Sequence, residues 1–231
     1  DINKKATDAT EHNIVIESGS FDTITCSDDS DYNIVKALAS ERRLRGTESG
    51  IIYEYSEIES LTEATDITVE KCDHKYANGN IAVDDDYVCY YCNSQIIATV
   101  SYTADGSEKT DLFGDICDAF DKANEAGTAT VTLQKNITDD ITDTIAVTGN
   151  VTLELNGKTL GSTFAFIAPV EVSDGGMFTV GGDGKMRMPI KAYANSKLIV
   201  GGGEFTSVMV YIDGDAEIGG GVIDALTIIG N

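Results

Sequence analysis

Short apolar strands that each run into a glycine corner recur through residues 150–231. They lie at 151–155, 177–180, 197–200, 216–218 and 226–229, and the corners read Asn-Gly, Gly-Gly or Gly-Asn. The last strand residues before the first four corners are Leu155, Val180, Val200 and Ile218, spaced by 25, 20 and 18 residues. A recurrence of roughly 20 residues is the length expected of one coil in a β-solenoid.

Stacking of coils explains why these residue types recur. A short β-branched strand does not bury its apolar face alone, whereas coils stacked about 4.8 Å apart bury one continuous column of Val, Ile and Leu. Glycine at a corner supplies a positive φ and lets successive backbones approach closely. A β-sandwich is the alternative, because other turn-rich β folds also place glycine after strands. The irregular period and the absence of hairpin alternation favour a mainly β protein with a right-handed parallel β-helix over residues 128–231.

A second copy of this pattern lies near the beginning of the chain. Residues 13–24 repeat the order of strand, glycine, Phe and second strand that is found at 196–208, with an internal offset of 184 residues between Ile14 and Leu198. We therefore expect residues 1–25 to be the end of a preceding solenoid unit. The chain begins with neither Met nor an apolar signal segment, which predicts a piece of a longer protein.

Apolar residues follow helical spacing at 32–45 and again at 111–126, with Gly46 and Gly127 as stops. The arginines Arg42, Arg43 and Arg45 would then lie in the last helical turn, where cations suit the helix dipole. The second helix directly precedes the solenoid, so we expect it to cap the open end of the first coil. The predicted order is a solenoid end (1–25), a helix-containing insert (26–70), a small α+β Cys/His module (71–110), a capping helix (111–127) and the β-helix (128–231).

The charge is strongly acidic, with 39 acidic against 16 basic residues and a net charge of -23. This charge argues against nucleic acid and against an anionic membrane surface as partners. No window of 18 or more apolar residues occurs, so no membrane insertion is expected. The glycine-rich run at 181–185 lacks the spacing of a phosphate loop, and no small-molecule cofactor is predicted.

The strongest chemical motif combines three cysteines with a histidine. Cys72 and His74 form a C-x-H pair, and Cys89 and Cys92 follow as C-x-x-C after fourteen intervening residues. A C-x-x-C turn brings two thiolates to one ion, and the alternate side chains of an extended C-x-H segment point the same way. Four such ligands predict a closed, structural zinc site that stabilises a small domain. A disulfide among these cysteines, or four unrelated residues, are the alternatives.

Catalytic sites have weaker support. Lyase chemistry on a β-helix needs calcium-binding acids and a basic residue on one face, and glycosidase chemistry needs two carboxylates at a set separation. The basic group at 185–191 has no matching acidic cluster on neighbouring strands. The run Asp84-Asp85-Asp86 is a weak candidate for calcium, because it lacks the spaced oxygens of a dedicated loop and a solvated acidic turn explains it better. We therefore predict a protein that is not an enzyme.

Several of these segments together resemble the repeat-bearing surface proteins of gut Firmicutes. The similarity rests on residues 18–24, the helix around 37–39, the Cys/His motif, the helix at 118–123 and the strand with its corner at 151–160. Asn93 departs from the glycine often found after C-x-x-C in that family. The resemblance implies an extracellular protein of the bacterial cell surface, anchored to the cell wall in its longer parent. Some proteins of this class are B-cell superantigens, so it also implies a host protein partner, with immunoglobulin variable domains first.

Tyrosines are the candidate binding residues. A protein binder needs an exposed patch with aromatic anchors, whereas a carbohydrate-active enzyme needs a charged cleft. The candidates are Tyr53, Tyr55, Tyr90 and Tyr91 around the Cys/His motif, and Tyr193 and Tyr211 in the solenoid. Packing of a small core is the alternative role for the first four. The predicted function is a non-catalytic module that binds a host protein or acts as an adhesin, and the alternative is a carbohydrate-active β-helix.

Overall fold

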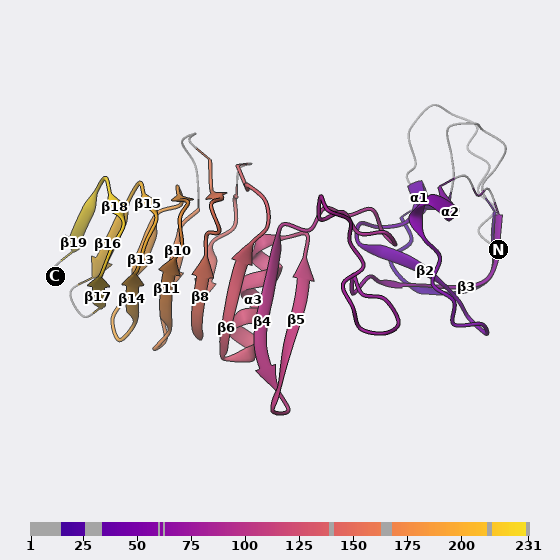
Figure 1. Cartoon of the computed structure of the whole chain (residues 1–231), viewed down its shortest axis with the longest axis horizontal. Helices are drawn as coiled ribbons and strands as arrows, with labels where there is room; N and C mark the ends of the chain where they lie inside the picture. Colours follow the sequence, from indigo (N-terminus) through magenta and orange to yellow (C-terminus); the bar gives the residue numbers. More distant parts are fainter. Residues whose placement is uncertain are drawn as a thin grey trace. The chain divides into compact units, whose positions relative to one another are not determined.

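The computed structural model describes residues 15–25, 34–59, 61, 63–138, 141–162, 168–211 and 214–229, and Figure 1 traces the chain. The chain forms two compact units, Asp1–Gln95 and Ile96–Asn231. Three clusters of buried apolar side chains occur among the described residues, two in the first unit and one in the second. None of these clusters draws residues from both units.

The first unit contains a three-stranded antiparallel sheet of order β1-β3-β2. Its strands are β1 (Gly19–Thr25), β2 (Arg42–Gly46) and β3 (Glu63–Lys71), and its short helices are α1 (Ile34–Ala37) and α2 (Tyr55–Ile58). The core of this sheet is apolar, because Ile34, Leu44, Ile58, Ile67 and Val69 are all almost fully buried.

The long helix predicted at 32–45 is wrong. Among the described residues of this stretch, Ile34–Ala37 are helical, and the arginine cluster lies on β2, which pairs with β3 from Arg42↔Lys71 to Gly46↔Ile67. Arg43 and Arg45 both form ion pairs with Glu70 of β3. This pairing between distant segments outweighs the helical spacing, which is only a weak local preference. Residues 26–33, including Cys26, lie outside the described residues.

The stretch that resembles a solenoid coil near the beginning has a different setting. Residues of β1 pair antiparallel with β3, from Gly19↔Val69 to Thr25↔Glu63. The matching residues Glu204 and Phe205 pair in parallel with strands of neighbouring coils. The assignment of residues 1–25 to a preceding solenoid unit stays a prediction, and residues 1–14 lie outside the described part.

The second unit is a parallel β-solenoid of about four turns, as predicted. Each turn places one strand in each of three sheets. The first sheet has the order β17-β14-β11-β8-β6-β4-β5, the second β18-β15-β12-β9, and the third β19-β16-β13-β10-β7. The bounds for the first sheet are β4 (Ala98–Ala104), β5 (Ser107–Phe113), β6 (Thr128–Leu133), β8 (Asn150–Glu154), β11 (Met177–Gly181), β14 (Lys197–Val200) and β17 (Asp215–Ile218). For the other two they are β9 (Thr159–Leu160), β12 (Lys185–Met186), β15 (Glu204–Phe205), β18 (Val222–Ile223), β7 (Ile145–Val147), β10 (Val170–Val172), β13 (Ile190–Ala192), β16 (Val208–Tyr211) and β19 (Leu226–Ile229).

Stacked coils bury continuous rows of apolar side chains. Val151, Phe178 and Leu198 are partners across β8, β11 and β14, and all three are fully buried. The residue in register with Val180 is Leu153, so Leu155, used in the spacing above, lies beyond the end of β8. Each fully buried large apolar side chain contributes about 1.5–3 kcal/mol relative to an exposed one, so the rows supply much of the stability of the solenoid.

One end of the solenoid is covered by an antiparallel hairpin and a helix. Strands β4 and β5 continue the first sheet beyond β6, and they meet at Asp105 and Gly106, which both have positive φ. Helix α3 (Ile116–Ala126) packs against this end, with Phe120 beside Phe178. Figure 1 shows α3 lying against β4 and β6. Helix α3 therefore shares the apolar core of the solenoid.

The beginning of α3 differs from the prediction. Residues 111–113 belong to β5, and the helix begins at Ile116 because the Asp115 carboxylate accepts hydrogen bonds from the backbone N–H groups of Cys117 and Asp118. An N-cap of this kind satisfies donors at the first turn. Within the described part of the chain, none of the helices combines the length and apolar character needed to cross a membrane.

Candidate metal centre

Two short segments of the first unit bring Cys72, His74, Cys89 and Cys92 together. The first follows directly after β3, and the second is a turn closed by a hydrogen bond from the Asn93 N–H to the Cys89 carbonyl. Backbone hydrogen bonds link the two segments through Ala82, whose N–H donates to His74 and whose carbonyl accepts from Tyr90. The spacing of the motif in the sequence thus corresponds to one cluster in space.

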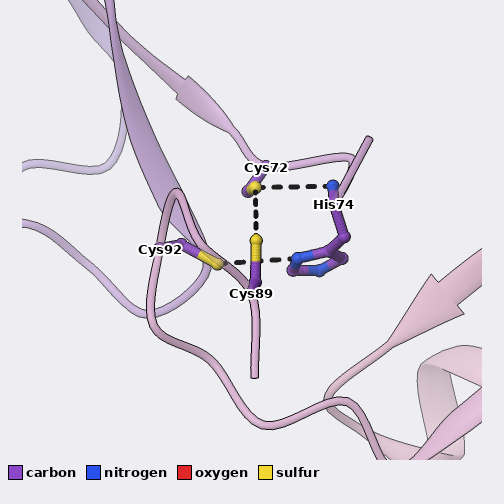
Figure 2. Close-up of side chains that lie close together, drawn as sticks. All are labelled: Cys72, His74, Cys89 and Cys92. Atoms are coloured by element: carbon purple, nitrogen blue, oxygen red, sulfur yellow. Dashed lines mark hydrogen bonds between the residues drawn. The ribbon is translucent and has the colours of Figure 1, made fainter. Parts of the chain in front are cut away.

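The four ligand atoms converge on a common centre. All lie within 4.8 Å of one another. The Sγ atoms of Cys72 and Cys89 are 3.7 Å apart, and the Sγ of Cys92 is 3.5 Å from Nδ1 of His74. Figure 2 shows the four side chains pointing toward one another from two separate segments of the chain. The cluster therefore has the residue types and the geometry of a structural metal site.

Backbone donors support two of the sulfurs. The N–H of His74 donates to Sγ of Cys72, and the N–H of Tyr91 donates to Sγ of Cys89, each at 3.4 Å. Such donors stabilise thiolates, the form in which cysteine binds metal. Both segments also need a left-handed residue, since His74 has a φ of 56° and Asn93 a φ of 55°. Asparagine tolerates this conformation, so Asn93 serves where glycine was expected.

Three of the four ligands are shielded from solvent. Cys72, His74 and Cys89 are at most 2% exposed, whereas Cys92 is partly exposed. Cys92 lines an open cavity of about 190 Å³ together with Arg42, Tyr55 and Asn93. All four ligands come from the protein, which leaves no open position of the kind that catalytic metal sites keep.

The thiols of Cys72 and Cys89 lie so close together that their pKa values shift in opposite directions. Hydrogen bonds from Cys72 and Cys92, and backbone N–H donors, lower the pKa of Cys89 to about 3. The pKa of Cys72 is raised, because its proton is shared with Cys89 and because Cys92 and burial oppose a second negative charge. A divalent cation removes this conflict, since it deprotonates coordinating thiols outright.

The disulfide alternative does not describe these residues. Cys72, Cys89 and Cys92 are free thiols, as is Cys117 of α3. Cys117 is partly exposed and packs against the solenoid core.

Three tyrosines gather beside the metal centre. The rings of Tyr76 and Tyr90 are stacked with centroids 6.3 Å apart, and Tyr91 meets Tyr76 edge-on at 5.8 Å. Tyr90 is 42% exposed, Tyr76 is half-buried and Tyr91 is 7% exposed. We call these three residues the tyrosine cluster. Among the candidates, Tyr91 thus packs in the core, while Tyr90 faces solvent.

The other predicted tyrosines have different surroundings, although the Tyr55 N–H donates to the Tyr90 carbonyl at 2.7 Å. Tyr53 packs against the core of the three-stranded sheet, and Tyr55 begins α2 and lines the cavity near Cys92. Tyr193 follows β13, and its hydroxyl donates to Glu171 of the preceding coil. Tyr211 ends β16, and its side chain lies outside the described ones. Of the candidates, Tyr90 and Tyr91 are the two that belong to the tyrosine cluster, through their ring contacts with Tyr76.

Asp84, Lys185 and Lys191 have structural partners. The Asp84 carboxylate accepts from the backbone N–H groups of Asp86 and Val88, so it closes its own turn. Among the described residues, the Cys/His cluster is the one grouping of three or more potential metal ligands. Lys185 and Lys191 form ion pairs across coils, with Glu204 and Glu171 respectively.

Residue spacing did not reveal the polar group next to the metal centre. Arg43 of β2 donates from Nε to Glu70 of β3 at 2.9 Å and pairs through Nη1 with Asp73. Asp73 lies between the ligands Cys72 and His74. The signal that could identify Arg43 is a buried arginine close to the cysteine motif. That closeness becomes visible only once the pairing of β2 with β3 is known.

No protein-family model, curated protein or solved structure matches this chain.

Proposed function

We propose that Cys72, His74, Cys89 and Cys92 hold a structural zinc ion. Ideal tetrahedral zinc, with Zn–S near 2.3 Å and Zn–N near 2.05 Å, requires S···S edges of about 3.8 Å and S···N edges of about 3.6 Å. Two of the six edges, 3.7 Å and 3.5 Å, agree with these values, and all six are at most 4.8 Å. When bound, zinc ties two segments that share only a small apolar core.

Metal analysis of the purified protein tests this assignment. We expect one zinc per chain, and cobalt substitution should give the ligand-field spectrum of a tetrahedral thiolate site. Cys72→Ser should abolish both signals, while the matched control Cys117→Ser should keep them. A zinc-free protein that neither takes up cobalt nor loses order with chelator would contradict the proposal.

We further propose that the chain is a non-catalytic, extracellular module of a bacterial cell surface that binds a host protein. The observation that carries this proposal is the tyrosine cluster, in which the exposed Tyr90 stands on a segment anchored at both sides by the metal ligands Cys89 and Cys92. Exposed aromatic rings on a rigid support are the usual anchors of protein interfaces, because they bury large area at low entropic cost.

Immunoglobulin variable domains are the first candidate partner. This choice follows from the resemblance to repeat-bearing surface proteins of gut Firmicutes. An adhesin for another host protein is the more general form of the same proposal. The pairing of Lys185 and Lys191 with acids of neighbouring coils supports a structural role for the basic group, in place of a catalytic one.

Interferometry with human Fab and Fc fragments of differing variable-region families tests the proposal. We expect binding to Fab of some families and none to Fc. Tyr90→Ala should weaken that binding at least tenfold, as expected for an interface anchor, with zinc content unchanged. Tyr193→Phe, in the other unit, is the control and should bind normally. Failure to bind any Fab would exclude immunoglobulin, and normal binding by Tyr90→Ala would exclude the tyrosine cluster.

A further inference from the structure

Arg43 is a buried, charged side chain next to the metal centre. The residue is 9% exposed, although guanidinium groups are seldom buried without partners. Its partners among the described residues are Glu70, at 2.9 Å from Nε, and Asp73, through Nη1. The residue therefore connects β2 and β3 to the segment that carries Cys72 and His74.

Asp73 has two roles in that segment. Its Oδ1 atom accepts a hydrogen bond from the Lys75 N–H at 3.1 Å and also pairs with Arg43. The next residue, His74, adopts the left-handed conformation with a φ of 56°. The Cys72 N–H is held by the Glu41 carbonyl at 2.8 Å. These contacts fix both ends of a turn whose two flanking side chains are metal ligands.

The charge of the centre also needs compensation. Three thiolates and a neutral imidazole around a divalent zinc ion leave one net negative charge, and a buried net charge is costly unless it is paired. Arg43 lies close enough to Cys72 for their charges to interact. Arg45 is more exposed, at 45% of its side chain, and its ion pair among the described residues is with Glu70.

We propose that Arg43 is a positioning residue for the metal centre. Arg43 holds Asp73 so that Cys72 and His74 face the ion, and its positive charge offsets the negative charge of the zinc–thiolate group. This inference rests on the proposed zinc site. Residues that orient metal ligands from outside typically change metal affinity by about 10–100-fold when they are replaced. Arg43→Gln should therefore weaken zinc affinity within that range.

Competition with a chromophoric chelator measures the zinc affinity of the wild type, Arg43→Gln, Arg43→Lys and Asp73→Asn. We expect a loss in Arg43→Gln, a smaller loss in Arg43→Lys, which keeps the charge but not the planar fork, and a loss in Asp73→Asn. The double variant should lose less than the two single losses combined, because each single change already breaks the same pair. Arg45→Gln is the matched control on the same strand and should keep wild-type affinity.

Cobalt spectra separate positioning from general stability. The thiolate-to-cobalt charge-transfer band should shift in Arg43→Gln at saturating cobalt, because the neighbouring cation of Cys72 is lost, and it should stay unchanged in Arg45→Gln. Should Arg43→Gln fail to fold, Asp73→Asn and Arg43→Lys carry the test. Wild-type affinity and spectrum in these variants, or an equal loss in Arg45→Gln, would overturn the role of Arg43 and leave the zinc site standing. Absence of metal binding by the wild type would overturn the zinc site and this inference together.

Discussion

Gly184 leads the chain into β12 with a φ of 145°, a conformation that residues with a side chain rarely adopt. A Cβ atom there would lie 2.4 Å from the carbonyl oxygen of Lys158 and 2.7 Å from Cβ of Leu155, both in the preceding coil. Gly157 also has a positive φ, of 73°, but nothing lies within 4 Å of its added Cβ. A comparison of the two glycines thus separates the free-energy cost of a positive φ from the cost of a steric clash with the preceding coil.

Gly184→Ala should lower the free energy of unfolding of the solenoid by about 3 kcal/mol or more, since strain and overpacking each cost about 1–3 kcal/mol. Gly157→Ala should cost about 1 kcal/mol, from strain alone. Urea denaturation of both variants measures the difference. Equal losses would show that the close approach of successive coils is not what requires Gly184.

Cys117 gives the second unit a dependence on alkaline pH. Burial, with smaller contributions from Asp115 and nearby acids, raises the pKa of this thiol from 9.0 to about 11. The folded chain therefore holds the proton more tightly than the unfolded chain, so this stabilisation is complete below about pH 9 and is lost as the pH rises toward 11. Cys117→Ala should lose less stability than the wild type over that interval in denaturant titrations. Parallel pH profiles of the two proteins would contradict this role for the thiol.

Sequence spacing identifies the four residues of the Cys/His cluster because each pair is local. Cys72 and His74, and Cys89 and Cys92, are two and three positions apart, so short-range geometry decides how each pair presents its atoms. Arg43 could not be assigned this way, since its partners Glu70 and Asp73 are 27 and 30 residues distant. The tyrosine cluster has the same limitation, because the burial of Tyr91 and the exposure of its neighbour Tyr90 depend on the packing around Ala82.

At the scale of elements, α3 closes the first coil of the solenoid. Phe120 is 1% exposed and meets Phe178 edge-on with ring centroids 5.9 Å apart. Asn124 adds polar contacts, since its side chain bonds Ala146, Thr148 and Gly149 of the first coil. The helix therefore supplies both apolar cover and hydrogen bonds at an edge that would otherwise be open.

Phe120→Ala should lower the free energy of unfolding of the second unit by about 3–5 kcal/mol, the usual result of removing a buried phenylalanine. The neighbouring exposed Asp121→Ala is the control and should change it by less than about 0.5 kcal/mol. Thermal and urea denaturation measure both. A loss near that of the control would mean that α3 is not part of the solenoid core.

Element types were predictable where local pattern and long-range pairing agree. The strands from 151 onward carry their own alternation and end in glycine corners, and the structure confirms them. Residues 42–45 fall within the helix predicted at 32–45 but form most of β2, because pairing with β3 and the ion pairs to Glu70 are stronger than a local preference. The start of α3 was placed too early because Leu112 continues the helical spacing although it belongs to β5.

At the scale of the whole molecule, the two compact units have separate cores. The apolar cluster of the solenoid draws on residues from 97 onward, whereas both clusters of the first unit lie between residues 16 and 92. The metal centre belongs entirely to the first unit. Removal of the proposed zinc ion should therefore act on one unit only.

A zinc chelator under reducing conditions should open the first unit and leave the solenoid folded. Metal binding is part of the folding free energy of a small domain with few buried apolar groups, whereas the solenoid has its own continuous apolar rows. Hydrogen exchange by mass spectrometry distinguishes the two units, because peptides from 63–95 should lose protection and peptides from 128–200 should keep it. In Cys72→Ser the same peptides should exchange fast without chelator, and chelator should add nothing. Loss of protection in both units at once would show that the solenoid depends on the metal centre, contrary to the separation of their cores.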